Sequence, residues 1–417
     1  MPISRGSIRH TLTEDIVNTV RSIVAPGRLA RRPSAAQRAA VSEKICRKFC
    51  YDHVVLFPYA RSAFHAILKA LDLPEKSEIL LTPITIGPML EVIMALGHKP
   101  VFVDVELETF CVDPNDLKAK LESKPACFLL TYLFGYVPDI ERIAGICREA
   151  GIPLIEDISH NIAATYNGRH LGAFGTAAIY SASLLKYVDA YNGAFVATKD
   201  KRLAERLKIE ISRYRNPDPR RIAKIIQTTL VWNISLRRTP FSLFVYPLLW
   251  IIKRLDIEKY EQILGARIKF LPQDKLPDYY FEDIASIQCE MISGQLDKLD
   301  ILIASRIKNA SKVAEVGKSI LGRQVTPSCS ESKSKRRHTF WQFVVPVKNL
   351  SSVRDVLFSL GVETGATNLM NLASLLDVDL PNARRIKENL IFIPIHEYIK
   401  IKDYQAIFTC VNEIDQI

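Results

Sequence analysis

Two stretches of the chain, Leu154-Ile-Glu-Asp-Ile-Ser-His-Asn161 and Ile179-Tyr-Ser-Ala-Ser-Leu-Leu-Lys186, decide the fold. Each begins with apolar residues typical of a buried strand and ends in residues that carry charge or hydroxyl groups. In an α/β protein the carboxyl ends of parallel strands meet at one edge of the sheet, where the functional site is usually found. We therefore expect Asp157 and Ser181 to lie at that edge, with Lys186 shortly after.

This combination can build a site for pyridoxal 5'-phosphate (PLP). An aspartate can pair with the pyridinium nitrogen, a lysine can form a Schiff base with the aldehyde, and serine hydroxyls can reach the phosphate. A lysine that ends a strand is more often merely solvated. The combination of Asp157 with Lys186 is far rarer by chance than either residue alone.

The rest of the N-terminal half alternates strand and helix signals. Strands are predicted over 54–57, 78–81, 101–103, 126–131, 154–155, 177–181 and 195–198, and helices over 60–71, 89–96, 117–121 and 140–150. The strands do not alternate in polarity, so both of their faces should be buried. Repeated βα units of this kind predict a mostly parallel sheet covered by helices.

Composition is that of a globular enzyme with two closely associated domains: 417 residues, 48% hydrophobic and 24% charged. The eight cysteines form no CxxC pair and no metal-ligand spacing, so we expect reduced thiols and no metal site. The N-terminus lacks the apolar core of a signal peptide, and no apolar run reaches about 18 residues. These features predict a cytoplasmic protein.

We divide the chain into four parts. They are an N-terminal helical segment (1–50), a large domain (51–215), a basic and aromatic-rich insertion (216–278), and a connecting helix with a small α+β domain (279–417). In the last part, helices are predicted over 284–302, 306–316, 353–360 and 404–414, strands over 340–347 and 390–393, and a polar loop over 328–337.

The chain has a net charge of +11, and a strongly basic stretch reaches into the insertion. Between Arg213 and Arg254, nine basic residues are opposed only by Asp218, and aromatic and aliphatic residues lie among them. Three interpretations stay open: a helical hairpin packed on its own domain or on a dimer partner, a segment that docks on a membrane surface through 226–254, and nucleic-acid binding. The last lacks a motif, so no nucleic acid is expected. Pro247 makes a single straight helix doubtful.

Several blocks of the chain resemble the DegT/StrS-type sugar aminotransferases, over roughly 50–215 and 280–415. The matching blocks are Ala60-Arg-Ser-Ala-Phe64, Gly97-His-Lys-Pro-Val-Phe-Val-Asp-Val105, Tyr132-Leu-Phe-Gly135, Ile155-Glu-Asp-Ile-Ser-His160, Gln295-Leu-Asp-Lys-Leu-Asp300 with Arg306, and Ile393-Pro-Ile-His396. The resemblance implies a fold-type-I PLP-dependent transferase, with a mostly parallel seven-stranded sheet in the large domain and a small C-terminal α+β domain.

The resemblance also implies roles for individual residues. Lys186 would be the catalytic residue and would hold PLP covalently; Asp157 would face the ring nitrogen, and His160 would lie against the ring. The other expected cofactor contacts are Ser181, Ser62, Arg61 and Ile86, and the expected substrate contacts are Asn192, Tyr132 and His396. For Ser62 and Ser181, a helix cap and a strand-end hydroxyl are the alternatives, and Asn192 is equally well an ordinary turn residue.

The chain departs from the family pattern at four positions. Ile86 stands where the family has an aromatic ring over the PLP face, and Asn192 replaces a glutamate after the lysine. The family's asparagine and arginine that reach the neighbouring subunit's phosphate fall near Phe281 and Asp283. These departures affect the expected substrate and dimer contacts more than the expected cofactor.

We therefore predict a PLP-dependent aminotransferase that transfers an amino group from an amino acid, such as glutamate, to a nucleotide-linked keto-sugar, in surface-polysaccharide or secondary-metabolite biosynthesis. A homodimer is expected, since fold-type-I sites normally form between two subunits. Two alternatives stay open: a PLP enzyme that acts on a different or lipid-linked substrate at the inner membrane surface, and a non-catalytic scaffold of the same fold.

Overall fold

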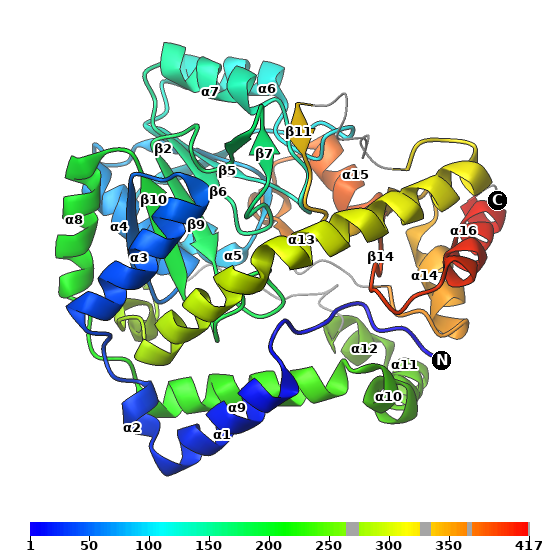
Figure 1. Ribbon diagram of the computed structural model, residues 1–417. Coiled ribbons are helices and arrows are strands. Elements are labelled where there is room, and N and C mark those ends of the chain that lie inside the picture. The colour runs from blue at the N-terminus through cyan, green and yellow to red at the C-terminus, as the bar shows by residue number, and fades with distance from the viewer. Residues whose placement is uncertain (264–274, 326–334, 365–368, 416–417) are drawn as a thin grey trace.

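The computed structural model describes residues 1–263, 275–325, 335–364 and 369–415. A seven-stranded sheet lies at the centre, and the long helix α13 (Ser286–Leu321) crosses from it to a smaller C-terminal layer (Figure 1). In spatial order the strands are β1 (His53–Phe57), β10 (Ala194–Thr198), β9 (Ala177–Ser181), β6 (Leu154–Asp157), β5 (Cys127–Thr131), β2 (Glu78–Leu81) and β4 (Lys99–Phe102). Strand β10 is antiparallel to both neighbours, and the remaining adjacent pairs are parallel. The predicted mostly parallel sheet is confirmed.

Both faces of this sheet are buried, as the unbroken apolar strands predict. Along β5, Cys127 and Leu129 belong to one core cluster, whereas Phe128 and Leu130 belong to another on the opposite face. All four side chains are fully buried. Burial of each large apolar side chain stabilises the fold by about 1.5–3 kcal/mol, so the two clusters fix the sheet between its covering helices.

The large domain surrounds the sheet with helices that begin at clear sequence signals. Asp113 and Asp139 accept hydrogen bonds from first-turn amides at the start of α6 and α7. The helices are α4 (Ala60–Leu71), α5 (Gly87–Ala95), α6 (Pro114–Lys120), η1 (Leu121–Ser123), α7 (Ile140–Glu149) and α8 (Lys201–Ser212). Three short strands complete the domain: β3 (Ile84–Thr85), β7 (Thr165–Tyr166) and β8 (Arg169–His170).

The N-terminal segment is helical, as predicted, and reaches several parts of the molecule. It contains α1 (Leu12–Val24), α2 (Pro26–Leu29) and α3 (Ala35–Phe49). A capping box between Thr11 and Glu14 starts α1. Ahead of α1, Ile3 forms a β-bridge with Val362 of the small domain. This bridge holds the start of the chain against the C-terminal layer.

The insertion is helical over its described residues. It forms α9 (Pro219–Ser235), α10 (Arg238–Pro240), the π-helical turn η2 (Phe241–Val245), α11 (Tyr246–Leu255) and α12 (Ile257–Ile263). Pro247 lacks the N–H that a regular helix would use, and the π turn directly before it absorbs the change. Helix α9 packs on α1, and Phe241 and Leu249 pack on Phe358 of the small domain. These helices therefore pack on their own chain, one of the interpretations left open above.

The C-terminal part contains a two-stranded antiparallel sheet, β12 with β14, packed among helices. Its elements are η3 (Asp278–Phe281), α13, β11 (Arg336–Arg337), β12 (Phe343–Pro346), α14 (Leu350–Ser359), β13 (Met370–Asn371), η4 (Ala373–Leu376), α15 (Pro381–Asn389), β14 (Leu390–Ile393) and α16 (Ile401–Asp415). The predicted loop 328–337 lies mostly outside the described residues. Its last two residues were wrongly assigned to the loop, because they pair with β7 as a strand.

Candidate active site

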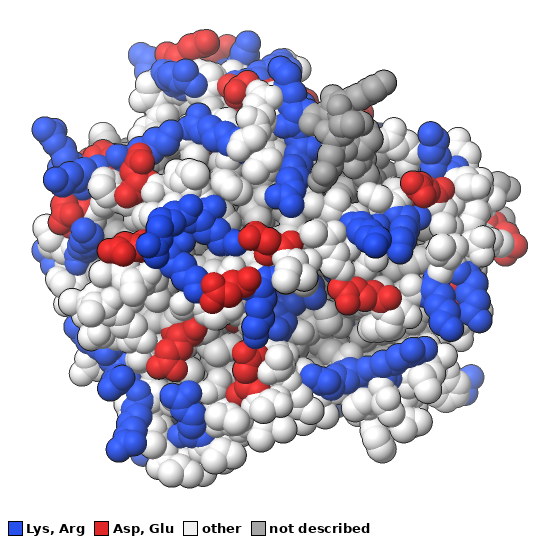
Figure 2. Space-filling model, viewed as in Figure 1, with Lys and Arg blue, Asp and Glu red and all other residues white. Residues whose placement is uncertain are grey.

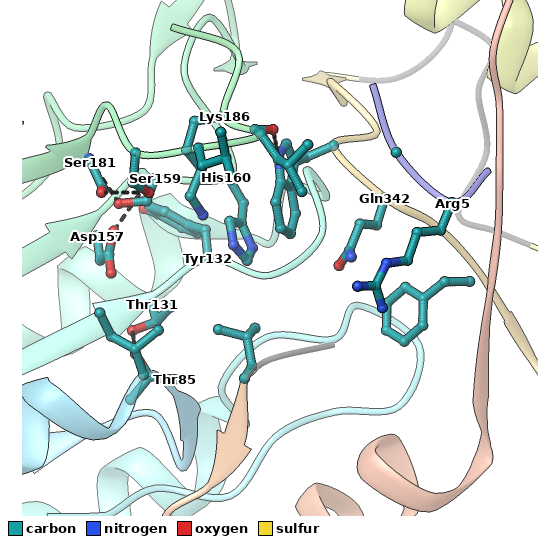
Figure 3. Close-up of a pocket in the computed structure, with 18 of the residues that line it drawn as sticks. Arg5, Thr85, Thr131, Tyr132, Asp157, Ser159, His160, Ser181, Lys186 and Gln342 are labelled. Atoms are coloured by element: carbon teal, nitrogen blue, oxygen red, sulfur yellow. Dashed lines mark hydrogen bonds between the residues drawn. The ribbon is translucent and has the colours of Figure 1, made fainter. Parts of the chain in front are cut away.

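The carboxyl ends of β6 and β9 open into a cavity of about 370 Å³. The loop that carries Lys186 forms one wall, and the small domain contributes another through Trp341, Gln342 and Phe343. The N-terminal segment adds Arg5 and Gly6. Figure 3 shows Asp157, His160, Ser181 and Lys186 gathered on one side of this cavity, and Arg5 with Gln342 on the other.

The adjacent acids at the end of β6 have different surroundings. Asp157 lines the cavity, and its carboxylate accepts a hydrogen bond from the Ser159 amide at 3.0 Å. Glu156 points to the opposite face, because successive residues of a strand alternate. There its carboxylate accepts hydrogen bonds from the Tyr132 hydroxyl and from three backbone amides at 172, 174 and 175. Glu156 therefore holds a loop, and Asp157 is the acid available to a ligand.

Burial controls the protonation of the two central charged groups. It raises the pKa of Asp157, although hydrogen bonds from Ser159 and the charge of Lys186 oppose the shift. Burial also lowers the pKa of Lys186 from 10.5 to about 8, and the Asp157 carboxylate opposes that change. A buried lysine with a pKa near neutrality supplies the unprotonated amine that a nucleophile or general base requires.

A buried network holds the Lys186 loop from behind. The Leu185 amide donates to the Asp189 carboxylate at 3.0 Å, and Leu185 itself adopts a left-handed conformation (φ 69°). The His10 ring lies 2.7 Å from the Asp189 carbonyl oxygen and 2.8 Å from the Asp15 carboxylate. Burial lowers the pKa of His10, but Asp15 and Asp189 outweigh burial and raise it. Through these contacts His10 ties the N-terminal segment to the lysine loop.

His160 is fixed in the cavity by its neighbours. The Phe134 amide donates to its Nδ1 at 3.3 Å, which leaves Nε2 as the protonated nitrogen of the neutral ring. Burial keeps this ring neutral by lowering its pKa well below the ordinary value. Trp341 stacks on His160 with ring centroids 3.7 Å apart, and its indole N–H donates to the Leu185 carbonyl. The Lys186 amine lies 4.3 Å from the centroid of the same indole.

Hydroxyl groups surround the base of the cavity. The Ser181 and Ser183 hydroxyls lie 3.2 Å apart, and the Ser181 amide donates to the Ser159 hydroxyl at 3.0 Å. On the neighbouring strands, the Thr131 hydroxyl lies 3.2 Å from that of Thr85. These groups can donate to the oxygens of a phosphate or of the cofactor ring.

The structure brings only some of the predicted residues to this cavity. Lys186, Asp157, His160, Ser181, Ile86 and Tyr132 line it. The Tyr132 hydroxyl is engaged by Glu156, so its ring rather than its hydroxyl is available. Ser62 is fully buried and donates to the Tyr280 carbonyl at 2.6 Å, away from the cavity.

Three other predicted residues lie elsewhere. The Arg61 guanidinium lies over the rings of Tyr59 and Tyr280, 4.3 and 4.6 Å from their centroids. Arg61 and Asn192 line a second cavity of about 360 Å³. His396 is buried with its Nε2 2.8 Å from the Ser4 carbonyl oxygen, where it anchors the N-terminal segment and has no place in the main cavity.

Two of the departures from the family pattern have structural explanations. Phe281 packs edge-on against His65 and Tyr214. Asp283 is buried and pairs with Arg38 and, at 3.5 Å, with Arg32 of the N-terminal segment. Both positions therefore stabilise the contacts of this chain with itself.

Further residues line the cavity that the sequence did not single out. Those with polar or aromatic side chains include Arg5, Thr85, Thr131, Ser159, Ser183, Trp341 and Gln342. The two serines stand inside the quoted motifs, which could have identified them. Trp341 carries no local signal, since its place against His160 depends on how the small domain packs.

The donor set fits PLP. The buried Lys186 amine, whose pKa is lowered, matches the aldehyde. The buried Asp157 carboxylate matches the ring nitrogen, and the hydroxyl groups match the phosphate. Helix α4 also begins at the cavity, with Ala60 lining it, and no side chain caps its first turn. Its free amides suit a phosphate.

Comparisons with known proteins agree with this site. The model of the DegT/DnrJ/EryC1/StrS aminotransferase family matches residues 10–220, just over half of the chain. A pleiotropic regulatory protein of Geobacillus stearothermophilus is 36% identical over 148 residues, which cover 35% of this chain and 40% of that protein.

Solved structures show the same fold. An aminotransferase from Psychrobacter cryohalolentis has a TM-score of 0.73 at 16% identity, over 99% of this chain and 98% of that one. PseC of Helicobacter pylori, an aminotransferase involved in the biosynthesis of pseudoaminic acid, has a TM-score of 0.71 at 15% identity, over the whole of both chains. From the family match, with Asp157 and Lys186 in place, the chain belongs to the DegT/DnrJ/EryC1/StrS aminotransferase family.

Proposed function

We propose that the protein is a PLP-dependent aminotransferase that moves an amino group from an amino acid to a keto-sugar. The observation that carries the proposal is the buried Lys186 amine, whose pKa is about 8, in one cavity with the buried Asp157 carboxylate. When bound, PLP supplies a conjugated ring that accepts the electrons released at the carbon bearing the amino group.

Lys186 would do most of the proton transfer. It would hold the cofactor covalently at rest and, once displaced by the donor's amino group, would take the proton from the donor's α-carbon. A pKa near 8 leaves a useful fraction of the amine neutral at physiological pH. The nearby indole of Trp341 restricts the lysine side chain to the cavity.

Asp157 and His160 would set the electronics and the position of the ring. The Asp157 carboxylate, fixed by the Ser159 amide, would keep the ring nitrogen protonated. His160 would present its Nε2–H to a ring substituent, since Phe134 occupies Nδ1. Ser181 and the first amides of α4 would hold the phosphate.

The second cavity supports a nucleotide-linked acceptor. Arg61, Arg221 and Lys224 line it, together with the rings of Tyr59 and Tyr279. Three cations suit a diphosphate, and Arg61 and Arg221 lie over the rings of Tyr59 and Tyr279, 4.3 and 4.5 Å from their centroids, which holds both guanidinium groups at this cavity. Leu184 lines both cavities, so they are adjacent. Asn192 lies in this second cavity, where its predicted contact with substrate would be made.

Family membership supports a sugar acceptor, and the structurally similar PseC is an aminotransferase involved in the biosynthesis of pseudoaminic acid. Glutamate as the donor and a homodimer stay predictions made from the sequence resemblance, and a cytoplasmic location stays a prediction made from the cysteines and the apolar runs of the sequence.

The absorption spectrum of the purified protein with PLP tests the proposal. The wild type should show a visible band that Lys186→Ala lacks, and glutamate should bleach it. A supply of alternative amino acids in the same assay would identify the donor. A wild-type protein that forms no such band, or a band unaffected by every amino donor, would overturn the aminotransferase assignment.

A further inference from the structure

The helical insertion exposes an apolar surface that the fold itself leaves uncovered. On η2 and α11, Phe244, Leu248, Ile251 and Leu255 are 71%, 55%, 47% and 82% exposed. They recur at spacings of four, three and four residues and therefore form one row along the helix. We call these four residues the outer row. The neighbouring Leu243 and Trp250 are exposed as well.

The opposite side of the same helix is also apolar. Phe241 and Leu249 are buried against Tyr260 and Phe358. A surface helix of a globular protein normally turns polar residues outward, whereas a helix that is apolar all round is covered on all sides. The outer row therefore points to a partner rather than to water.

Helix α1 adds to this surface along the same edge of the molecule. It packs on α9, and Figure 1 places α1, α9 and α11 together below the sheet. Its residues Ile16, Val20, Ile23 and Val24 are exposed by 45% to 78%. In Figure 2 the corresponding lower edge is largely white, bordered by basic side chains and, toward the left, by acidic ones as well.

The charge around the outer row indicates which kind of partner binds there. From residue 219 to residue 255 the chain contains seven basic residues and no acidic one. Arg237 and Arg238 precede the row, and Arg254 lies at its far end, stacked on Trp250 at 4.0 Å. In a twofold dimer this patch would meet its own copy, so like charges would face each other. An anionic surface complements it instead.

We propose that η2 and α11 dock the protein on an anionic lipid bilayer, with the outer row among the acyl chains and the arginines at the headgroups. Apolar residues with an aromatic, flanked by arginines, are the composition of helices that lie in the membrane interface. No helix within the described ranges is long and apolar enough to cross a bilayer, which fits a helix lying flat. The proposal does not depend on the catalytic assignment.

The insertion that would meet the lipid also forms part of the catalytic cavity. Trp232 of α9 and Ile263 at the end of α12 belong to this insertion and line that cavity. The element that docks on the membrane would thus be continuous with one wall of the cavity that holds Lys186.

Vesicle flotation of the full chain tests the proposal. The wild type should float with vesicles of phosphatidylcholine mixed with phosphatidylglycerol, and much less with phosphatidylcholine alone. The triple variant Phe244→Ser, Leu248→Ser, Ile251→Ser should bind at least about tenfold more weakly, since binding scales with the apolar area buried. A matched control changes Ile209, Ile301 and Ile401 to serine. These residues lie on other helices and are 55% to 78% exposed, and the control should float like the wild type.

A second variant isolates the charge. Arg237→Gln with Arg254→Gln should weaken binding to the anionic vesicles by about fivefold for each arginine and reduce its sensitivity to salt. Wild-type protein that stays with the soluble fraction, or a triple variant that floats normally, would overturn the proposal. So would a wild-type dimer that the triple variant converts to monomer without any vesicle binding, because the outer row would then be a subunit interface. For every variant, the absorption spectrum with PLP reports separately whether the catalytic site is intact.

Discussion

Lys186 should capture PLP with a pH dependence that an exposed lysine does not show. Burial lowers its pKa to about 8. At pH 7.5 such a group is neutral in about a quarter of the molecules, whereas a lysine with the ordinary pKa of about 10.4 is neutral in about one in a thousand. The neutral amine is the species that attacks an aldehyde. The cavity should therefore present about 200 times more reactive amine than a surface lysine does.

The assay follows the growth of the visible absorption band after mixing with PLP, between about pH 6 and pH 10. The rate should rise with pH and level off near pH 8, where the Lys186 amine loses its proton. Lys186→Arg keeps a cation but no nucleophile, and it should show no band. A rate that keeps climbing towards pH 10, or a band of equal size in the arginine variant, would refute the reasoning.

Three substitutions test other parts of the site. Asp157→Asn should keep the visible band but slow amino transfer from the donor by about a hundredfold or more, because it removes the charge facing the ring nitrogen. A stopped-flow rate of amino transfer within tenfold of wild type would count against that role of Asp157. Glu156→Ala leaves four donors without their acceptor, two of them in buried and two in part-buried hydrogen bonds. It should lower the free energy of unfolding by at least about 3 kcal/mol in urea titrations, and an unchanged midpoint would be the contrary result. Trp341→Leu removes the stack on His160 and the hydrogen bond to the lysine loop, so the Kd for PLP should rise about tenfold. The control Trp250→Leu, on the surface, should leave the Kd for PLP unchanged.

The parts of the fold that the sequence predicted well are those with strong local patterns. The bounds predicted for β2, β9, β14 and α4 agree with the structure. The two-residue strands β3, β7, β8 and β13 escaped prediction, because so few residues show no periodicity. The pairings of β7 with β11 and of β3 with β13 also join segments that are distant along the chain.

In the candidate site, too, the residues that could be predicted from the sequence are those with strong local patterns. Asp157, Ser181 and Lys186 follow apolar strands, so topology alone brings them to one edge. Ser62 and His396 resemble motif residues but are turned away by hydrogen bonds to segments distant in the sequence, Ser62 to the Tyr280 carbonyl and His396 to the Ser4 carbonyl. Such orientations depend on packing that a motif does not encode.

The outer row could be identified only from the structure. The sequence shows that the insertion is basic and apolar, but both faces of α11 are apolar, and spacing alone cannot tell which one is buried. The packing of Phe241 and Leu249 on Phe358 decides it.

Covalent mapping of the cofactor tests the central claim most directly. The protein would be incubated with PLP, reduced with borohydride, digested and examined by mass spectrometry for modified lysines. The predicted result is one dominant modified peptide, containing Lys186, which disappears in Lys186→Ala. Modification spread over surface lysines, or a dominant adduct at another lysine, would contradict the assignment of Lys186 and Asp157 as the centre of the active site.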